Sequence, residues 1–271
     1  MPELPEVETI RLQLEDKIKN KKIKKVEVLQ PRMINVSARE FVKRVEKSKV
    51  KDIRRRAKLL IIDLSSGYSL IIHLKLTGNL IYNQESDKYT NVVFEFSDGK
   101  KLLYKDIRKF GWMKLIKTHD VSVFLEKHKF GPEPLSKEFT LEKFKEMLAK
   151  KKRSKIKPLL MDQTFLAGVG NIYSQESCFL AEVDPRRKAG SLTDREIKDL
   201  YNNLRKIMAA SIKFRGSSVD TYVDLFGKEG QFVPRLKVYR KGGKKCLRCK
   251  AKLKTIKLAG RGTTFCPKCQ K

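Results

Sequence analysis

The first 130 residues change their hydrophobic period from a helical pattern to a strand pattern. Within residues 5–20 the apolar side chains recur every three or four residues, which predicts an amphipathic helix. They are Val7, Ile10, Leu14 and Ile18. From about residue 23 to 117, runs of β-formers end in turn residues, as in VFEFSDG and LIIDLSSG, and predict antiparallel hairpins. The fold predicted for residues 1–130 is a β-sandwich or barrel with an N-terminal helix, and the sandwich is the form we expect.

Helical periodicity returns after FGPEPL, a predicted linker at residues 130–135. One helix is predicted within residues 140–152, and a second begins near Pro158. The glycines of AGVGN at residues 167–171 interrupt this second helix before another starts. The apolar face of the first helix consists of Leu141, Phe144, Met147 and Leu148.

Thr193 and Glu196 have the spacing of a capping box, which predicts a further helix. Its apolar face consists of Ile197, Leu200, Leu204 and Ile207. Residues 215–235 hold several glycines and no strong period, so we expect a long, mobile loop there. The predicted fold is therefore α+β and multidomain, with a helical domain at 131–237 and a cysteine-rich domain at 238–271.

The charge of the chain narrows the class of partner. Sixty-two Lys and Arg against 31 Asp and Glu leave a net charge of +31, which indicates a polyanionic partner such as nucleic acid. No segment approaches 18 consecutive apolar residues, and the start lacks the features of a signal peptide, so a membrane partner is not expected. We expect a cytoplasmic, nucleoid-associated protein whose five cysteines are reduced.

The cysteine spacing in the tail is typical of one structural Zn²⁺ site. Two Cys-x2-Cys pairs are separated by sixteen residues, and four thiolates close a tetrahedral site without an open position. The expected ligands are Cys246, Cys249, Cys266 and Cys269. Between the pairs, LKTIKLAGRGTTF predicts two strands joined at residues 260–262, with Arg261 pointing outward as a phosphate contact or a solvated turn residue. Cys178 lies outside this pattern and is predicted to be a core residue.

The stretch KPLLMDQTFLAGVGNIYSQE predicts two helices separated by a glycine turn. The N-terminus of the second helix, near Asn171, presents backbone N–H groups and a positive dipole end to a phosphate. Lys157 lies just before the first helix. Because helix–turn–helix pairs are common in folds that bind nothing, this motif alone leaves DNA binding open.

Three motifs, MPELPEVET, KPLLMDQ…GVGNIY and AGRGTTFCPKC, occur in this order along the whole chain. Together they resemble the bacterial formamidopyrimidine-DNA glycosylases, the Fpg/MutM branch of the helix-two-turn-helix family that also includes the endonuclease VIII group. The resemblance implies a base-excision repair enzyme that removes 8-oxoguanine opposite cytosine and formamidopyrimidines, then cleaves the strand by β,δ-elimination. It also implies a monomer that binds double-stranded DNA containing a damaged base or an abasic site.

The same resemblance implies that Met1 is removed and that the amine of Pro2 is the nucleophile. An α-amino group has a pKa of about 8, so part of it is unprotonated near neutrality and can form a Schiff base. Glu3 matches the family's general acid/base, and Glu6 matches a supporting acid. Lys58, in RRRAKLL, matches a lysine that binds the phosphate beside the lesion, as Arg261 does from the zinc hairpin.

Further DNA contacts follow from the resemblance at HLxMTG, DxRxFG, KPLLMDQ, GVGNIY and the loop FRGSSVDTYVDLFGKEG. They are His73, Leu76, Arg108, Phe110, Lys157, Asn171, Tyr173 and Ser218. Leu76 stands where relatives usually have a methionine wedge, and Arg108 is expected to face the orphaned cytosine. Phe110 is either a second wedge or a core aromatic residue of a strand. Asp220 lies in the lid over the flipped base, where relatives often carry a basic residue, so the lesion preference stays open.

Two other functions are compatible with the sequence. One is an endonuclease VIII-like glycosylase and lyase that prefers oxidised pyrimidines. The other is a non-catalytic DNA or RNA binder built on the zinc hairpin.

Overall fold

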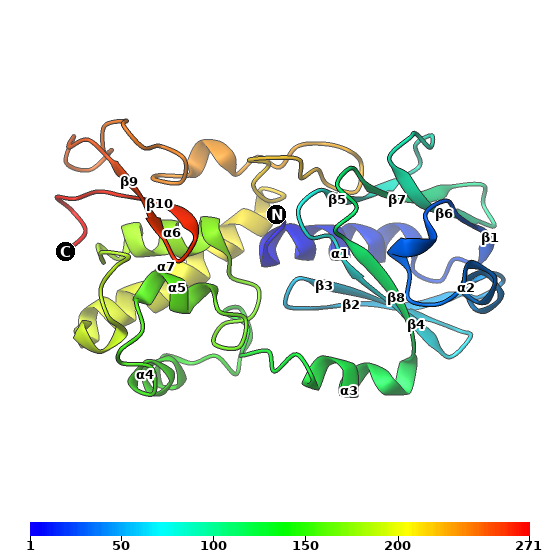
Figure 1. The fold of residues 1–271 in the computed structure, drawn as a ribbon, viewed down its shortest axis with the longest axis horizontal. Coiled ribbons are helices and arrows are strands. Elements are labelled where there is room, and N and C mark those ends of the chain that lie inside the picture. Colours follow the sequence, from blue (N-terminus) through cyan, green and yellow to red (C-terminus); the bar gives the residue numbers. More distant parts are fainter. The chain divides into compact units, whose positions relative to one another are not determined.

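The computed structural model describes residues 1–271, which form two compact units (Figure 1). Unit 1 consists of Met1–His128 and Ile212–Val233, and unit 2 of Lys129–Ser211 and Pro234–Lys271. The segment predicted as a mobile loop thus belongs largely to unit 1. The boundaries of the three predicted domains stay a prediction.

Unit 1 is built on two four-stranded antiparallel sheets, with strand orders β1-β6-β7-β5 and β2-β3-β4-β8. The strands are β1 Ile23–Val28, β2 Val50–Arg56, β3 Leu59–Leu64, β4 Tyr68–His73, β5 Gly78–Tyr82, β6 Thr90–Phe96, β7 Lys101–Asp106 and β8 Trp112–Lys117. The predicted β-sandwich is confirmed. The two predicted hairpins are also confirmed, as β3–β4 and β6–β7.

The N-terminal helix α1 (Leu4–Ile18) buries the predicted apolar face in the core of the sandwich. Each of its four aliphatic side chains contributes about 1.5–3 kcal/mol by leaving water. Helix α2 (Ala38–Val45) was not predicted within the β-region. Its sequence signal is Ser37, whose hydroxyl accepts a hydrogen bond from the Glu40 N–H at 3.2 Å. Helix α3 (Val121–Glu126) follows the last strand of the sandwich along the chain.

Unit 2 contains the helices that the apolar pattern predicted and a two-stranded hairpin. They are α4 Leu141–Ala149, α5 Ile156–Met161, α6 Asn171–Leu180, most of α7 Asp194–Lys213, and the strands β9 Lys254–Leu258 and β10 Arg261–Phe265. Short 3₁₀ turns occur in the chain at Pro31–Met33, Thr118–Asp120, Ala189–Ser191 and Val233–Arg235. Helix α5 begins two residues before Pro158, the predicted start.

The predicted capping box at the start of α7 is confirmed. Thr193 N–H donates to Glu196 Oε2 at 2.7 Å, and Glu196 N–H donates to Thr193 Oγ1 at 3.3 Å. The four predicted apolar residues of α7 are buried. None of the helices combines the length and the hydropathy that a membrane-spanning segment needs.

Candidate active site and zinc centre

The N-terminal end of the chain is fixed by the carboxylate of Glu6. Pro2 is buried and follows the exposed Met1, and α1 starts at Leu4 with Glu3 as its N-cap. The Glu3 N–H donates to Glu6 Oε2 at 2.9 Å, and both glutamates are almost fully buried. Glu6 therefore holds the backbone one residue away from Pro2.

The second oxygen of Glu6 binds the lid loop, which we define as residues 214–230. Ser217 N–H donates to Glu6 Oε1 at 2.8 Å. Next to it, Gly216 has a φ of +84°, and a Cβ there would lie 2.9 Å from both Glu6 Cγ and a ring carbon of Tyr222. Only glycine fits this close approach without displacing its neighbours. One buried carboxylate thus connects the N-terminal end to the base of the lid loop.

Lys58 and His73 come together where three strands meet. Lys58 occupies the turn between β2 and β3 and is 7% exposed, and the β3–β4 register places the adjacent Leu59 opposite His73. Lys75 N–H donates to His73 Nδ1 at 2.9 Å, so the proton of the neutral ring lies on Nε2. The Trp112 ring lies 5.7 Å from that of His73.

The pKa of His73 is lowered to about 3. Burial is the largest cause, followed by the positive charges of Lys75, Lys58 and His128. His73 is therefore a neutral hydrogen-bond donor at physiological pH. It is not a cation.

A buried aspartate joins the two turns that carry the predicted wedge residues. Asp106, fully buried, accepts hydrogen bonds from Thr77 Oγ1 at 2.5 Å, Arg108 N–H at 3.2 Å and Gly111 N–H at 2.7 Å. Thr77 follows Leu76 directly, so Asp106 fixes the turns of Leu76 and Arg108 together. The motif DxRxFG contains this residue, yet we did not predict its role.

Arg108 and Phe110 project from the β7–β8 turn. The Arg108 guanidinium lies 4.9 Å from the centre of the Phe110 ring, and Phe110 is 55% exposed. The interpretation of Phe110 as a core aromatic residue of a strand is therefore wrong. The hydrophobic period of the sequence did not show this, because β7 ends at Asp106 and β8 begins only at Trp112, so that Phe110 lies in the turn between them.

The lid loop has no regular secondary structure, but it makes hydrogen bonds at its base and its tip. At the base, Gly230 N–H donates to Ser218 Oγ at 2.7 Å, whereas Asp220 is exposed. At the tip, Thr221 Oγ1 donates to the Leu76 carbonyl at 3.2 Å, and Asn79 Nδ2 donates to the Thr221 carbonyl at 3.3 Å. The tip is thus connected to the turn of Leu76. That the loop moves stays a prediction.

In unit 2, the predicted phosphate-binding residues cluster at the start of α6. The fully buried Lys157 donates from Nζ to Asn171 Oδ1 at 2.6 Å. Tyr173 is also fully buried, and its hydroxyl lies 2.6 Å from Ser211 Oγ. The Tyr173 side chain therefore packs α6 against α7. Lys157 acts on Asn171, a role that its sequence position did not reveal.

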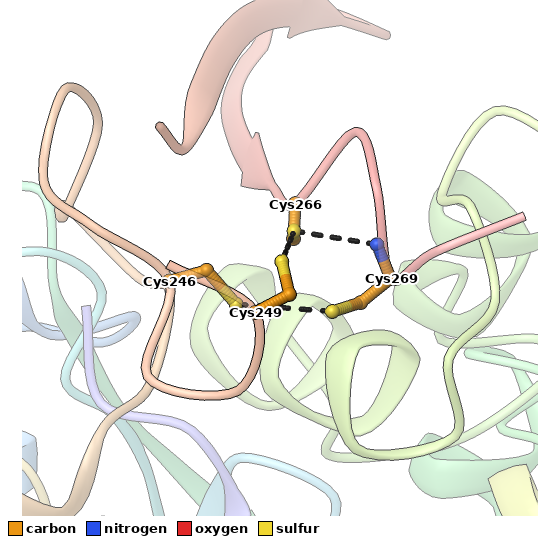
Figure 2. Close-up of side chains that lie close together, drawn as sticks. All are labelled: Cys246, Cys249, Cys266 and Cys269. Carbon is orange, nitrogen blue, oxygen red and sulfur yellow. Dashed lines mark hydrogen bonds between the residues drawn. The ribbon is translucent and has the colours of Figure 1, made fainter. Parts of the chain in front are cut away.

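The four cysteines of the tail form one cluster at the end of the β9–β10 hairpin. Figure 2 shows their side chains converging, and the four Sγ atoms lie within 4.8 Å of one another. Cys269 N–H donates to Cys266 Sγ at 3.4 Å. A backbone hydrogen bond from Ala251 is the main cause that lowers the pKa of Cys249 to about 7, whereas burial raises the pKa of Cys266 and of Cys269. Four converging thiols, two of them with backbone donors, fit one structural Zn²⁺.

The hairpin that carries Arg261 differs slightly from the predicted one. Its turn is Ala259–Gly260, both with positive φ, and Arg261 is already the first residue of β10, paired with Leu258. The predicted turn at residues 260–262 started one residue too late and ended two residues too late. Arg261 is exposed beside the turn, as predicted. Cys178 is fully buried, which raises its pKa to about 12 and confirms that it is a core residue.

Three family models match the chain in succession. They are the formamidopyrimidine-DNA glycosylase N-terminal domain at residues 1–113, the formamidopyrimidine-DNA glycosylase H2TH domain at residues 130–223, and the zinc finger found in FPG and IleRS at residues 243–271. These matches define the class as a DNA glycosylase with a helix-two-turn-helix domain and a zinc finger.

Whole-chain comparisons narrow the class to one family. A formamidopyrimidine-DNA glycosylase of Pelotomaculum thermopropionicum is 41% identical over 275 residues, which cover 100% of this chain and 99% of the relative. The Lactococcus lactis Fpg, solved in complex with DNA containing an abasic site, matches with a TM-score of 0.92 and 39% identity over 99% of each chain. MutM in complex with DNA containing carbocyclic 8-oxo-G matches with a TM-score of 0.91 and 38% identity over 100% of each chain. The chain belongs to the formamidopyrimidine-DNA glycosylase family.

Proposed function

We propose that this protein is a bifunctional DNA glycosylase and abasic-site lyase of base-excision repair. Its substrates are 8-oxoguanine opposite cytosine and formamidopyrimidines in double-stranded DNA. The observation that carries this proposal is the N-terminal end, where Glu6 fixes the Glu3 N–H and the base of the lid loop at once. Membership of the family over the full chain supports the assignment.

In the proposed reaction, removal of Met1 exposes the secondary amine of Pro2. The Pro2 nitrogen attacks C1′ of the damaged nucleotide, the bond from C1′ to the base breaks, and the base leaves with the proton that the amine releases. Glu3 protonates the sugar ring oxygen, so the ring opens and an iminium forms between the Pro2 nitrogen and C1′. The positive nitrogen acidifies the C2′ proton. Its loss expels the 3′ phosphate, and a second elimination then expels the 5′ phosphate.

The other residues hold the DNA during these steps. Lys58, neutral His73, Asn171 and Arg261 bind backbone phosphates, and Lys157 positions Asn171. Leu76, Arg108 and Phe110 fill the space left by the flipped nucleotide, with Arg108 facing the orphaned cytosine. Ser218 and its neighbours in the lid loop contact the flipped base, and Tyr173 contributes its backbone. Zinc takes no part in the reaction, because its four ligands leave no open position.

The protein acts as a monomer at the nucleoid. Its three functional parts are a catalytic domain at residues 1–130, a helix-two-turn-helix domain at 131–237 and a zinc finger at 238–271. The net charge of +31 supports association with DNA.

A panel of duplexes tests the proposal by strand cleavage. We expect cleavage at 8-oxoguanine opposite cytosine and at formamidopyrimidines, and none in undamaged DNA. The variant Glu3→Gln should lose about a hundredfold or more in base excision, the range for a general acid. Preferential cleavage at oxidised pyrimidines would instead favour the endonuclease VIII-like activity. Tight binding to abasic DNA without any cleavage would favour a non-catalytic binder.

A further inference from the structure

Gln175 is a buried amide that nothing in the proposed mechanism uses. It lies one turn after Asn171 on α6 and is 2% exposed. A buried amide needs hydrogen-bond partners on both its nitrogen and its oxygen, since each group without a partner costs about 1–3 kcal/mol. Here both atoms have partners, and these partners belong to two different elements.

The nitrogen of Gln175 faces three oxygen atoms from two residues. Nε2 donates to the Asn171 carbonyl at 2.8 Å, lies 3.0 Å from Asn171 Oδ1, and reaches the Gly262 carbonyl at 3.1 Å. Asn171 Nδ2 also reaches the Gly262 carbonyl, at 3.3 Å. The start of α6 and the residue after Arg261 thus share one small hydrogen-bond network.

The oxygen of Gln175 fixes the direction of the strand. Oε1 accepts from the Thr264 N–H at 2.6 Å, so one amide pairs with a carbonyl and an N–H two residues apart on β10. This is the pattern by which a neighbouring strand would pair with that edge. Gln175 therefore defines both the distance and the register of β10 relative to α6.

The next residue on α6 anchors the chain that leads into the hairpin. The fully buried Glu176 accepts from the N–H groups of Lys237, Val238 and Tyr239 at 2.7, 2.8 and 2.7 Å. The entry to the zinc finger is thus held independently of Gln175. Loss of the Gln175 amide should change where the hairpin turn lies without detaching the whole finger.

We propose that Gln175 is a positioning residue that sets Arg261 and Asn171 at a fixed spacing, so that both grip the DNA backbone together. The proposal rests on the proposed function, because it takes both residues as phosphate contacts. Lys157, with its Nζ on Asn171 Oδ1, completes the network on the other side. A preformed pair of contacts binds more tightly than two groups that must be ordered on binding.

The variant Gln175→Met tests this, because it keeps the side-chain length and removes the amide. Gln270→Met is the matched control: Gln270 is also buried, accepts from Cys266 N–H at 2.8 Å and donates to the Val183 carbonyl at 2.8 Å, and its side chain makes no hydrogen bond with Asn171 or β10. Wild type and both variants are compared for zinc content, affinity for a lesion duplex over a range of salt, and single-turnover cleavage at saturating enzyme.

We expect Gln175→Met to weaken binding about tenfold and to lower the slope of log affinity against log salt by about 1, the signature of one lost phosphate contact. Saturated cleavage should change less than twofold, and Gln270→Met should leave the slope unchanged. In an Arg261→Ala background, adding Gln175→Met should weaken binding by a further factor of less than two, because Arg261 and Asn171 no longer contact the DNA backbone together.

An unchanged slope, or equal effects of the two methionine variants when both keep full zinc content, would overturn the proposal. So would full additivity with Arg261→Ala. If Gln175→Met loses zinc, the same measurements on Gln175→Glu decide, because that variant keeps the acceptor for Thr264 and removes the donor to Gly262. A wild-type protein that neither binds nor cleaves the lesion duplex would instead count against the proposed function.

Discussion

The residues proposed to grip the DNA backbone in unit 2 and the lid loop of unit 1 are held in different ways. In unit 2, the side chains of Lys157 and Gln175 make hydrogen bonds of 2.6–3.1 Å, and both residues are buried. At the lid tip, Thr221 and Asn79 make bonds of 3.2–3.3 Å, and both bonds are exposed. Long, solvated hydrogen bonds contribute little to stability.

This difference in hydrogen bonding matches the part of the DNA that each region would contact. The DNA backbone is the same at every site, so a preformed set of contacts serves all sequences. In the proposed function, the lid loop would meet a base that must first enter the site, and the long hydrogen bonds at Thr221 would let its tip move aside. Other parts of the lid loop are held more firmly. Glu6 holds its base through a buried bond of 2.8 Å, and the fully buried Leu225 donates its N–H to Gln13 Oε1 at 2.9 Å.

Loss of zinc is expected to have the largest effect on DNA affinity. Cys249→Ser, or chelation, removes the metal that folds the tail, and with it the positions of Arg261 and Gly262. Affinity for a lesion duplex should fall about a hundredfold, the equivalent of two charged contacts at about 1.5 kcal/mol each. Fluorescence anisotropy with metal analysis measures this, and far-ultraviolet circular dichroism checks that the sheets of unit 1 persist. Full affinity after complete zinc loss would contradict it.

Asp106→Ala should give the next largest effect, now in unit 1. It leaves the Arg108 and Gly111 N–H groups and the Thr77 hydroxyl without their acceptor, which costs about 3 kcal/mol of unfolding free energy. Excision should fall about tenfold or more, and affinity less than threefold, because the wedge turns lose their position while the phosphate contacts stay.

The control for Asp106→Ala is Asp63→Ala. Asp63 accepts from Arg54 at 2.7 and 2.9 Å and from Ser69 at 2.6 Å, in the other sheet. Urea unfolding and single-turnover excision should separate the two variants. Equal losses of excision in both would show that the role of Asp106 is only structural.

His73 should make unfolding depend on pH in a defined window. Its pKa is lowered from about 6.5 in the unfolded chain to about 3 in the folded protein, so the unfolded chain binds more protons between these values. Above pH 6.5 the residue contributes nothing to the pH dependence. Below it, stability falls as the pH falls, by at most about 1.4 kcal/mol per pH unit.

The measurement is urea unfolding of wild type and His73→Asn between pH 4 and 7.5. The stability difference between the two proteins should shift in favour of the variant as the pH falls below 6.5. An imidazole nitrogen spectrum should show Nε2–H of His73 throughout. A titration of His73 near pH 6.5 would show that burial does not lower its pKa and would contradict this prediction.

Asn79→Ala should have the smallest effect on excision and affinity, because it removes only bonds at the tip of the lid loop. It removes the bonds from Asn79 to the Thr221 carbonyl and from the Val223 N–H, each worth about 0.5 kcal/mol. Hydrogen exchange at residues 221–223 should accelerate about threefold, with excision changed less than threefold and affinity unchanged. If this variant weakens binding as much as Gln175→Met, the distinction between the two regions is wrong.

Much of the fold could be predicted because the local signals agree with the structure. The period of α1, the two hairpins and the capping box of α7 each combine an apolar pattern with turn or cap residues. Helix α2 was missed although Ser37 and Glu40 form a cap signal, because the surrounding β-pattern outweighed it. The hairpin turn was placed too late because Gly260 and Gly262 both suit a turn, and only pairing with β9 distinguishes them.

The site was less predictable, because its positioning residues act across the fold. Asp106, Gln175 and the Lys157–Asn171 pair depend on partners that no local spacing reveals. For Phe110 a local signal gave the wrong answer: its strand propensity suggested a core residue, whereas the turn fixed by Asp106 exposes it. The zinc ligands were easy to predict, because the Cys-x2-Cys spacing of each pair is itself typical of a zinc site.

Borohydride trapping followed by peptide mapping identifies the nucleophile of the proposed reaction. Protein without Met1 is incubated with a duplex containing 8-oxoguanine opposite cytosine, reduced, digested and analysed by mass spectrometry. We predict one covalent adduct, on the nitrogen of Pro2, which Glu3→Gln sharply reduces. An adduct on a lysine such as Lys58, or cleavage of the strand without any trapped complex, would contradict the account.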